Sequence, residues 1–262
     1  MTLEDKFAFS KDLCQSAGLL ARDYFARRGQ LRVDQKGSHD WVSEADRKIE
    51  SFIRERIAEA WPDDRIVGEE HGGTSGANGF TWVIDPIDGT TNFLNGIPTW
   101  TIVLAGVSEC KTQFGVVHDP VYDETFSALR GRGAKLNGQS VHVAEGKSLD
   151  EGTVGLGYSN RIKPENVTSI VSALVVRGTM FNRNASGALS LAYVAAGRLL
   201  GYVEEHMNAW DCLAGQLLVA EAGGVVEDQN ADEMIRKGGR VIAGAPQVFE
   251  DLKSIAVPAW GG

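Results

Sequence analysis

A short segment in the first third of the chain, residues 82–93, constrains the protein more than any other part of its sequence. Apolar residues 82–84 are followed at once by Asp85 and Asp88, with a proline between the two aspartates. Aspartate and proline are both disfavoured within strands, so we expect an apolar strand that ends at the two carboxylates. This segment therefore has a role other than packing.

The two aspartates and the turn after them predict a point where a cation and an anion meet. Asp85 and Asp88 offer the hard oxygen ligands that a small divalent cation prefers. Gly89 and Thr90 begin the next segment, where backbone N–H groups can bind an anion such as phosphate. The alternative, from these residues alone, is a surface turn in which an aspartate side chain caps the backbone.

Length and charge narrow the class of protein. The 262 residues can bury a substantial core, and a hydrophobic content of 43% is ordinary for a globular protein. The net charge of −9 argues against nucleic acid or an anionic membrane as the main partner. The same charge would repel a phosphate ester unless bound metal ions reversed the local field. Metal binding and phosphate binding are therefore linked hypotheses.

Cysteine usage and the N-terminal residues favour a cytoplasmic protein. Cys14, Cys110 and Cys212 are odd in number and widely spaced, which argues against a disulfide framework. Residues 1–20 carry charges throughout and lack the apolar core of a signal peptide. No apolar run approaches the length of a membrane span. We therefore expect reduced thiols, a cytoplasmic location and no membrane partner.

The periodicity of apolar residues changes near residue 143 and predicts two halves. In residues 1–142, two amphipathic helices, one ending near Gly29 and one running from Ser43 to before Pro62, precede short strands separated by turns, which we predict to form an antiparallel sheet. In residues 143–262, strands alternate with helices, which is typical of an α/β layer. The predicted strands are 65–68, 81–84, 101–107, 114–117, 125–129, 153–156, 179–181, 199–203, 225–226 and 241–243, and the later helices are 164–176, 188–196, 210–222 and 248–255.

Further acidic residues stand at the ends of predicted elements. Glu69 follows a strand and precedes residues 72–79, a glycine-rich stretch expected to be a mobile loop, and Asp211 lies in the first turn of an apolar helix. Asp46 follows Ser43 by three residues, the spacing of a capping box. Solvation of Glu69 and helix capping by the two aspartates are the ordinary alternatives. Together these residues predict carboxylates gathered from several elements, which is how a multi-metal site is assembled.

Several other kinds of site are disfavoured by spacing. The five histidines are scattered without pairing, which argues against a zinc site. Residues 155–157 are too short to be a dinucleotide fingerprint, and no Walker-type lysine motif is present. Ser186 lacks the G-x-S-x-G elbow of a serine hydrolase.

Several short motifs follow one another along the chain: 42–46 (VSEAD), 68–70 (GEE), 85–93 (DPIDGTTNF), 115–120 (GVVHDP), 133–138 (GAKLNG), 210–215 (WDCLAG) and 221–224 (EAGG). Taken in order, they resemble the motifs of the inositol monophosphatase family of magnesium-dependent, lithium-sensitive phosphatases. The resemblance spans nearly the whole chain. It implies a layered αβαβα sandwich of the inositol monophosphatase and fructose-1,6-bisphosphatase type, which agrees with an α+β half followed by an α/β half.

The resemblance implies two or three Mg²⁺ ions. The first is expected on Glu69, Asp85 and the carbonyl of Ile87. The second is expected on Asp85, Asp88 and Asp211, so that Asp85 bridges the two ions. Glu69 would also touch a weaker third ion.

The resemblance also assigns catalytic roles. Asp46 and Thr90 are expected to form a hydrogen-bonded pair that positions and deprotonates the attacking water, and with Glu69 they make up the expected catalytic set. The amides of Gly89 and Thr90 are expected to cradle the phosphate. Attack is expected to be in line, without a covalent intermediate.

The residues that face the alcohol half of the substrate are less constrained. Glu204 stands where relatives place a glutamate that contacts sugar hydroxyls, and Gly187 lies in a small-residue turn that approaches the substrate. Asn208 stands where the animal enzymes of the family carry histidine, and Ser190 stands where many bacterial relatives carry aspartate, which leaves the alcohol open. The expected substrate-binding residues are Asp88, Gly89, Thr90, Gly187, Glu204 and Asp211.

The expected activity is hydrolysis of a small polyol or sugar phosphate monoester, with myo-inositol 1-phosphate as the default substrate. Related families act on fructose 1,6-bisphosphate, 3′-phosphoadenosine 5′-phosphate or histidinol phosphate, for which Arg161, Lys163 and Arg183 are candidate basic residues. A third hypothesis is a regulatory binding protein on the same scaffold, since some bacterial relatives assist transcription complexes. The family also implies a homodimer.

Overall fold

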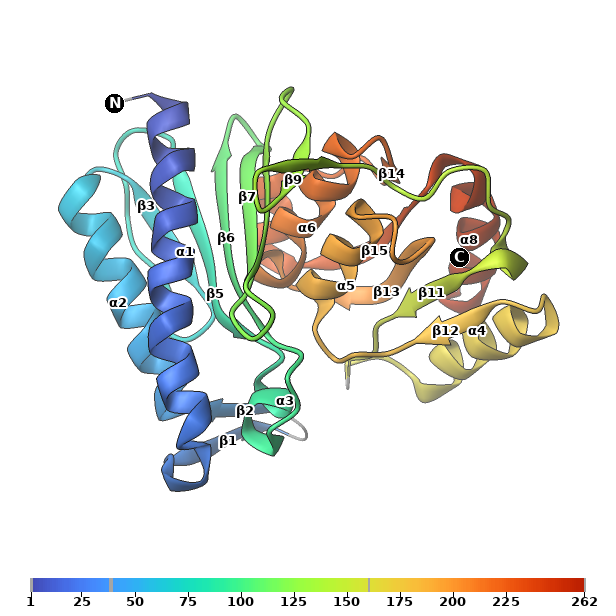
Figure 1. Cartoon of the computed structure of the whole chain (residues 1–262), viewed down its shortest axis with the longest axis horizontal. Coiled ribbons are helices and arrows are strands. Elements are labelled where there is room, and N and C mark those ends of the chain that lie inside the picture. Colours follow the sequence, from blue (N-terminus) through green and yellow to red (C-terminus); the bar gives the residue numbers. More distant parts are fainter. Residues whose placement is uncertain (1, 38–39, 160, 262) are drawn as a thin grey trace.

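Helices form alternate layers of the computed structural model, which describes residues 2–37, 40–159 and 161–261. The longest helices are α1 (Leu3–Ala26), α2 (Glu44–Ala60), α4 (Pro164–Val176), α5 (Gly187–Ala195), α6 (Ala209–Glu221) and α8 (Pro246–Ala259). α1 and α2 lie on one outer face, α5 and α6 in the middle, and α4 and α8 at the opposite face, with a sheet between successive pairs (Figure 1). The predicted αβαβα sandwich is confirmed.

The first two helices begin at capping boxes. At α1, the N–H of Asp5 donates to Oγ1 of Thr2 at 3.2 Å, and the N–H of Thr2 donates back to Oδ2 of Asp5 at 2.7 Å. At α2, Ser43 and Asp46 make the same reciprocal arrangement. The face of α2 that packs on the sheet carries a fully buried stripe of Ile49, Ile53 and Ile57. Both predicted helices are therefore present, with capping side chains fixing where they begin.

The larger sheet is mixed, so the predicted antiparallel sheet is wrong at one pair. Its strands, in spatial order, are β10 (Gln139–Val141), β9 (Ala134–Leu136), β8 (Glu124–Leu129), β7 (Lys111–Asp119), β6 (Thr101–Ser108), β5 (Thr81–Asp88), β3 (Arg65–Gly68) and β4 (Gly72–Gly73). β3 and β5 run parallel, with Gly68 opposite Ile84. The intervening segment carries the chain back to the start of β5. As a result, the residues that follow Gly68 and Ile84 meet at one edge of the sheet.

The glycine-rich stretch 72–79, predicted as a loop, begins as the short strand β4. Gly73 pairs with Val67 of β3, and the N–H of Thr74 donates to the carbonyl of Ile66 at 2.8 Å. The rest of the stretch follows as a loop that is tied back by the N–H of Ala77, which donates to the carbonyl of Asp63 at 2.9 Å. Two glycines carry little strand propensity, which is why the pattern did not predict pairing here.

β5 continues through Asp88, so the prediction that the strand ends at Ile84 is wrong. Asp85 lies opposite Val103 and Asp88 lies opposite Thr101. Between these two pairs β5 has two residues where β6 has one, which is a β-bulge. This bulge accommodates the proline, which has no N–H to donate to the ladder. It also turns the two aspartates out of strict strand alternation, which lets both face the same side of the molecule.

The smaller sheet is also mixed. Its strands, in spatial order, are β12 (Met180–Asn182), β11 (Thr153–Leu156), β13 (Gly201–Met207), β15 (Gly239–Gly244) and β14 (Val225–Val226). β11 pairs in parallel with both neighbours, whereas β13, β15 and β14 pair antiparallel. The strand predicted at Leu199–Val203 is β13, which begins two residues later, at Gly201, and continues four residues further, to Met207, and so includes Glu204. α6 contacts strands of both sheets, so the two halves share one helical layer.

Several short elements were not predicted because they are too short or too polar to show a periodicity. They are the hairpin β1 (Val33–Gly37) and β2 (Asp40–Ser43), α3 (Thr90–Asn95), β4, β9, β10, α7 (Ala231–Lys237) and the 3₁₀ turns η1 (Arg28–Gln30) and η2 (Leu149–Glu151). Among the described residues, no helix combines the length and apolar character needed to cross a bilayer.

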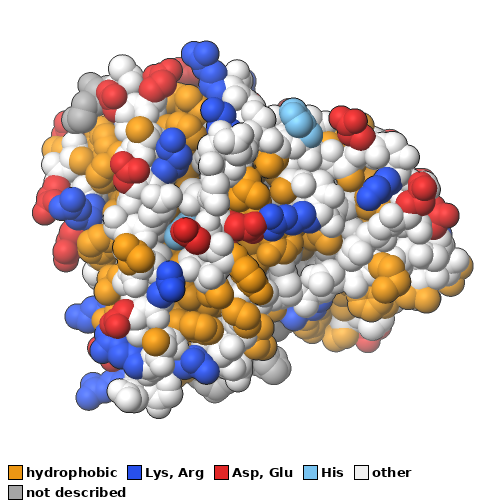
Figure 2. Space-filling view, in the orientation of Figure 1, with side chains coloured by type: hydrophobic (Ala, Val, Ile, Leu, Met, Phe, Trp, Pro, Cys, Tyr) orange, Lys and Arg blue, Asp and Glu red, His pale blue; other side chains and the backbone are white. Residues whose placement is uncertain are grey.

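Exposed apolar side chains gather at the end of the molecule formed by α4 and β12 (Figure 2). The side chain of Val176 is 83% exposed and that of Met180 is 68% exposed. β12 is an edge strand of the smaller sheet. We call this surface the α4–β12 patch, and it consists of Val175, Val176, Met180 and Phe181.

Candidate active site

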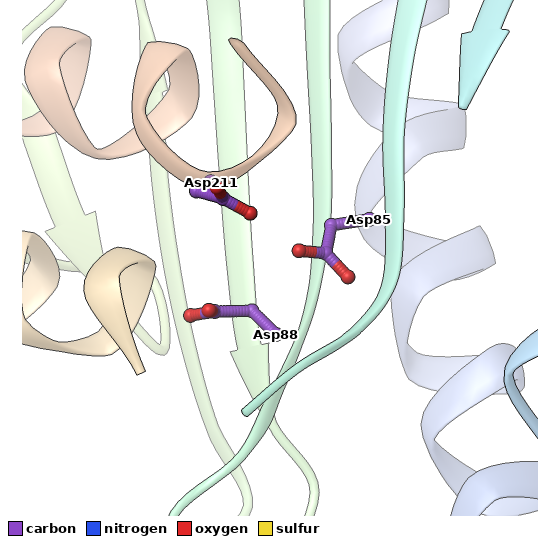
Figure 3. A group of neighbouring side chains, drawn as sticks. All are labelled: Asp85, Asp88 and Asp211. Carbon is purple, nitrogen blue, oxygen red and sulfur yellow. The ribbon is translucent and has the colours of Figure 1, made fainter. Parts of the chain in front are cut away.

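Three aspartates converge between the larger sheet and the middle helical layer. Asp85 and Asp88 come from the bulged end of β5, and Asp211 comes from the first turn of α6 and points across toward β5 (Figure 3). Each offers one carboxylate oxygen, and these three oxygens lie within 4.8 Å of one another. Asp85 is 1% and Asp88 8% exposed. The structure thus brings together three of the predicted ligands, although Asp211 lies 126 positions after Asp85 in the sequence.

Burial and mutual repulsion disfavour the charged forms of these aspartates. Burial raises the pKa of Asp85 well above its usual value, and the charges of Glu69, Asp88 and Asp211 raise it further. Burial and the nearby Asp211 charge raise the pKa of Asp88 to about 7. Burial also raises the pKa of Asp211, although hydrogen bonds from Asp85 and Asn208 lower it in part. Bound cations would offset this repulsion, and an all-carboxylate donor set suits Mg²⁺, a hard ion that prefers oxygen ligands.

Asp88 is also held by the start of α5. Oγ of Ser186 donates to Oδ2 of Asp88 at 2.5 Å, and the N–H of Ala188 donates to the same oxygen at 2.9 Å. The N–H of Gly187 donates to Oδ1 at 3.3 Å. Gly187, predicted as a substrate-facing residue, thus contacts an aspartate of the group. The contact of Ser186 with Asp88 was not predicted; a serine just before a helix signals only a capping hydroxyl, and Oγ of Ser186 does accept from the N–H of Leu189 at 3.3 Å.

Glu69 and the carbonyl of Ile87 flank the group. Glu69 follows β3, and because β3 and β5 are parallel it lies beside Asp85, whose pKa its charge raises. Among the described residues, the group whose ligand atoms all lie within 4.8 Å of one another consists of the three aspartates. Glu69 is not part of that group and therefore lies farther from it. The N–H of Ile87 donates to Oδ1 of Asp85 at 3.0 Å, and the carbonyl of Ile87 accepts from Oγ1 of Thr90 at 3.1 Å.

Asp46 and Thr90 meet as the resemblance implied. Oγ1 of Thr90 lies 3.1 Å from Oδ1 of Asp46, to which it donates. Asp46 is fully buried at the start of α2, and its Oδ2 accepts from both the N–H and the hydroxyl of Ser43, at 2.8 and 2.5 Å. Burial raises the pKa of Asp46, and the bonds from Ser43 and Thr90 lower it in part. The carboxylate therefore has one oxygen fixed by the helix cap and the other facing Thr90.

Gly89 begins α3, directly beside this pair. Its φ of +99° is a left-handed conformation that glycine adopts without strain, and a Cβ there would lie 2.9 Å from the carbonyl oxygen of Thr99. Any other residue would thus be both strained and crowded. The glycine lets the chain turn from the end of β5 into α3, which places Thr90 at the first position of the helix.

A cavity of about 160 Å³ opens beside Asp88 and Asp211 and is lined by Gly187 and Glu204. Oε2 of Glu204 accepts from the hydroxyl of Tyr202 at 2.5 Å. Burial raises the pKa of Glu204 to about 8, while the bond from Tyr202 acts in the opposite direction. Glu204 therefore faces the same cavity as the aspartates, in a setting where it binds a proton readily.

An adjoining cavity of about 500 Å³ reaches the surface and carries two arginines. Arg161 and Arg183 both line it, and Nη1 of Arg161 donates to Oδ1 of Asn208 at 2.7 Å. Lys163, the third predicted basic residue, instead precedes the first turn of α4 and is not among the lining residues. The other lining residues are Glu69, Thr91, Tyr158, Ser159, Ala185, Glu204, His206, Asn208 and Asp211.

Comparisons with known proteins match the chain in sequence and fold over nearly its whole length. A family model described as "Inositol monophosphatase family" matches residues 3–257. The chain is 35% identical over 251 residues to the Nus factor SuhB of Haemophilus influenzae, which covers 94% of this chain and 93% of the relative. The crystal structure of extragenic suppressor protein suhB from Bartonella henselae superposes with a TM-score of 0.88 at 33% identity, covering 94% of this chain and 95% of that one. The IMPase of Thermotoga maritima gives a TM-score of 0.87 at 32% identity, covering 97% and 98%.

Proposed function

This chain belongs to the inositol monophosphatase family, and we propose that it is a Mg²⁺-dependent phosphatase of a small polyol or sugar phosphate monoester. The observation that carries the proposal is the buried convergence of Asp85, Asp88 and Asp211 beside the Asp46–Thr90 pair. The default substrate is myo-inositol 1-phosphate, and the products are the alcohol and inorganic phosphate.

The ions would be held by the residues that the resemblance names. Glu69, Asp85 and the carbonyl of Ile87 would hold one Mg²⁺. Asp85, Asp88 and Asp211 would hold another, and Glu69 would contribute to a third. When bound, the ions would neutralise the phosphoryl oxygens, stabilise the leaving alkoxide and lower the pKa of the attacking water.

The chain's own residues would take up the proton of that water. The single hydrogen of the Thr90 hydroxyl has two acceptors at 3.1 Å, Oδ1 of Asp46 and the carbonyl oxygen of Ile87. When it points to Asp46, the lone pairs of the hydroxyl are available to accept a proton from the side of the aspartate group. Asp46 can receive the Thr90 proton in turn, because burial raises its pKa. The two bonds from Ser43 fix the carboxylate so that Oδ1 faces Thr90. The resemblance adds that the amides of Gly89 and Thr90 cradle the phosphate.

Gly187 and Glu204 are proposed to contact the alcohol half of the substrate. Both line the cavity beside Asp88 and Asp211. Glu204 offers oxygens that can accept from hydroxyl groups, and Tyr202 fixes one of those oxygens. A polyol is therefore the class of leaving group that this wall of the cavity suits.

The test is phosphate release from a panel of esters, with and without Mg²⁺. The panel contains inositol 1-phosphate, glycerol 2-phosphate, fructose 1,6-bisphosphate, 3′-phosphoadenosine 5′-phosphate and histidinol phosphate. We expect Mg²⁺-dependent release with a preference for the monoester of a polyol, and inhibition by lithium in the millimolar range. Absence of release from every ester would contradict the proposed activity.

A second candidate substrate class is a bisphosphate. Arg161 and Arg183 both line the wider cavity next to the aspartate group, and a second phosphate could bind between their guanidinium groups. In the panel, this alternative predicts preference for fructose 1,6-bisphosphate or 3′-phosphoadenosine 5′-phosphate. An Arg183→Ala variant would then raise the KM for the bisphosphate and leave that for glycerol 2-phosphate little changed.

The expected partners and location complete the proposal. A homodimer is supported by the α4–β12 patch, whose apolar side chains a second copy could cover. Sedimentation of the wild type and of a Val176→Asp variant tests this, and a monomeric wild type would contradict it. The name Nus factor, carried by relatives, supports a regulatory role beside catalysis, and the expected absence of a nucleic-acid partner and the cytoplasmic location stay predictions.

A further inference from the structure

One carboxylate of α2 is fully buried outside the aspartate group and the Asp46–Thr90 pair. Glu50 lies one helical turn after Asp46, and its side chain is 0% exposed. Its Oε2 accepts from the N–H of Glu70 at 2.7 Å, and its Oε1 accepts from the N–H of His71 at 3.2 Å. Nε of Arg54 donates to the same Oε1 at 2.6 Å. Burying a carboxylate is costly without such donors, and two of the donors are main-chain groups of one short segment.

Arg54 extends this contact by one residue. Its Nη2 donates to the carbonyl oxygen of Gly72, while its Nε holds Glu50. Glu50 and Arg54 therefore bind the backbone of three consecutive residues, 70–72. We call these two residues the Glu50–Arg54 pair. The pair ties the turn that follows β3 to α2, the helix that also carries Asp46.

Gly68 makes room for this pair. A Cβ at position 68 would lie 2.6 Å from Cδ of Glu50 and 3.0 Å from Nη2 of Arg54. The first separation is shorter than real Cβ contacts allow, so an alanine would displace the Glu50 carboxylate. The glycine before Glu69 is thus required for space rather than for backbone conformation, and it depends on Glu50.

Glu69 lies between two fixed points. On one side, its own N–H donates to the carbonyl of Ile84 at 3.3 Å, one residue before Asp85. On the other side, the N–H of the next residue, Glu70, is held by Glu50. Glu69 itself lies in a turn just beyond the end of the β3–β5 pairing, so that pairing places its main chain on one side and Glu50 holds the next residue on the other.

We propose that Glu50 is a positioning residue that sets the affinity of the cation site by fixing Glu69 beside Asp85. The proposal rests on the proposed function, in which Glu69 is a ligand. Glu50 is not among the proposed ligands, and it would act through the main chain of residues 69–71. Residues that orient metal ligands from outside the coordination sphere commonly change metal affinity strongly when replaced.

The decisive variant is Glu50→Gln, which keeps the size of the side chain but places an amide NH₂ against one of its present donors. We expect the dissociation constant for Mg²⁺, measured by calorimetric titration of the purified protein, to increase by about 10- to 100-fold. The Mg²⁺ concentration for half-maximal phosphate release should rise in parallel. Turnover at saturating Mg²⁺ should recover most of the wild-type value. A Gly68→Ala variant should show the same weakening, because it displaces the same carboxylate.

Two matched controls separate positioning from stability. Ile53→Val removes a buried methyl group from the same helix, and Glu59→Gln removes an exposed charge from it; Ile53 is 0% exposed and the Glu59 side chain is 68% exposed. Ile53→Val should lower the melting temperature with no change in Mg²⁺ affinity, and Glu59→Gln should change neither. If Glu50→Gln unfolds, Gly68→Ala carries the test.

Each outcome decides the proposal. Folded Glu50→Gln or Gly68→Ala protein with the wild-type affinity for Mg²⁺ would overturn it. Weakened Mg²⁺ affinity in Ile53→Val as well would also overturn it, since the effect would then follow stability alone. Failure of the proposed function is distinguishable, because a wild type that binds Mg²⁺ but releases no phosphate leaves the calorimetric comparison intact.

Discussion

The hydroxyl of Thr90 donates to a carboxylate oxygen of Asp46, a residue 44 positions earlier that also caps the helix on which it lies. The two oxygens of Asp46 thus have different roles. Oδ2 accepts from Ser43 in the capping box at the start of α2, while Oδ1 faces Thr90. The capping hydrogen bonds hold the carboxylate in one orientation, and a proton acceptor in catalysis needs such a fixed orientation. The cap and the proposed acceptor are therefore not competing explanations of Asp46.

Replacing Thr90 by valine is expected to remove the proton path while keeping the shape of the side chain. We expect kcat to fall by about 10²- to 10⁴-fold, because this is the usual contribution of a positioned acid or base. Thr90→Ser retains the hydroxyl and should keep most of the activity. Phosphate release at saturating Mg²⁺ measures both variants. Comparable activity of Thr90→Val and wild type would remove Thr90 from the proposed mechanism.

Replacing Asp88 by asparagine is expected to abolish Mg²⁺-dependent turnover and leave the fold intact. The asparagine carbonyl can still accept from Ser186 and Ala188, so the contact with the start of α5 is kept. One negative charge of the aspartate group is lost, and with it an oxygen ligand.

Thermal unfolding with and without Mg²⁺ checks the reason for this loss. A ligand that binds the folded state raises the melting temperature by mass action, so the wild type should be stabilised by Mg²⁺ and Asp88→Asn much less. Ser190→Ala, a change at a nearby buried hydroxyl that bonds Ser186 and Asn184, is the control. Normal Mg²⁺-dependent turnover in Asp88→Asn would contradict the assignment of Asp88 to the metal site.

The sequence predicted the acidic residues well but not how they come together. The apolar run before Asp85, the strands of the first half and the helix that carries Asp211 follow from periodicity. The parallel pairing of β3 with β5, which sets Glu69 beside Asp85, does not, because strand direction depends on the connection between strands rather than on their residues.

The bulge in β5 and the role of Ser186 were also beyond the pattern. Because aspartate and proline are disfavoured in strands, the predicted strand ended at Ile84. The actual strand β5 continues to Asp88, because a bulge accommodates both residue types. Ser186 bonds Asp88 from 98 positions away, and such a contact leaves no local trace in the sequence. Buried carboxylates such as Glu50 show the same limit, since their donors lie on another element.

His118 provides a test of pH dependence away from the aspartate group. It is 3% exposed, and burial lowers the pKa of its imidazole from 6.5 to about 4. The unfolded chain therefore binds a proton as the pH falls through 6.5, whereas the folded protein does so only near 4. The stability that His118 contributes is present above the unfolded pKa and is lost as the pH falls toward the folded pKa. Between about pH 7 and about pH 5, this one group should lower the free energy of unfolding by about 2 kcal/mol.

A His118→Gln variant isolates that contribution. Glutamine does not titrate, and it can keep a hydrogen bond to Thr125, whose Oγ1 lies 3.0 Å from Nδ1 of His118. Its free energy of unfolding in urea should therefore decline less than that of the wild type over the same pH interval, even if the substitution lowers stability at both values. Parallel declines of the two proteins would contradict the assigned burial of a neutral imidazole.

The buried ion pair between Lys6 and Asp64 is expected to be worth more than the exposed pairs on the surface. Asp64 is 4% exposed and accepts from Lys6, from Nε1 of Trp82 at 2.6 Å and from Asn78 at 2.5 Å. Asp64→Asn would leave the Lys6 ammonium buried without its counter-charge, and should lower the free energy of unfolding by about 3–5 kcal/mol. By contrast, Glu59→Gln, which breaks the exposed pair with Arg56, should cost less than about 1 kcal/mol. Urea unfolding followed by the fluorescence of the six tryptophans measures the free energy of unfolding of both variants. Equal losses in the two variants would show that water reaches Lys6, and that the network joining α1 to β5 is not the buried charge pair that its geometry indicates.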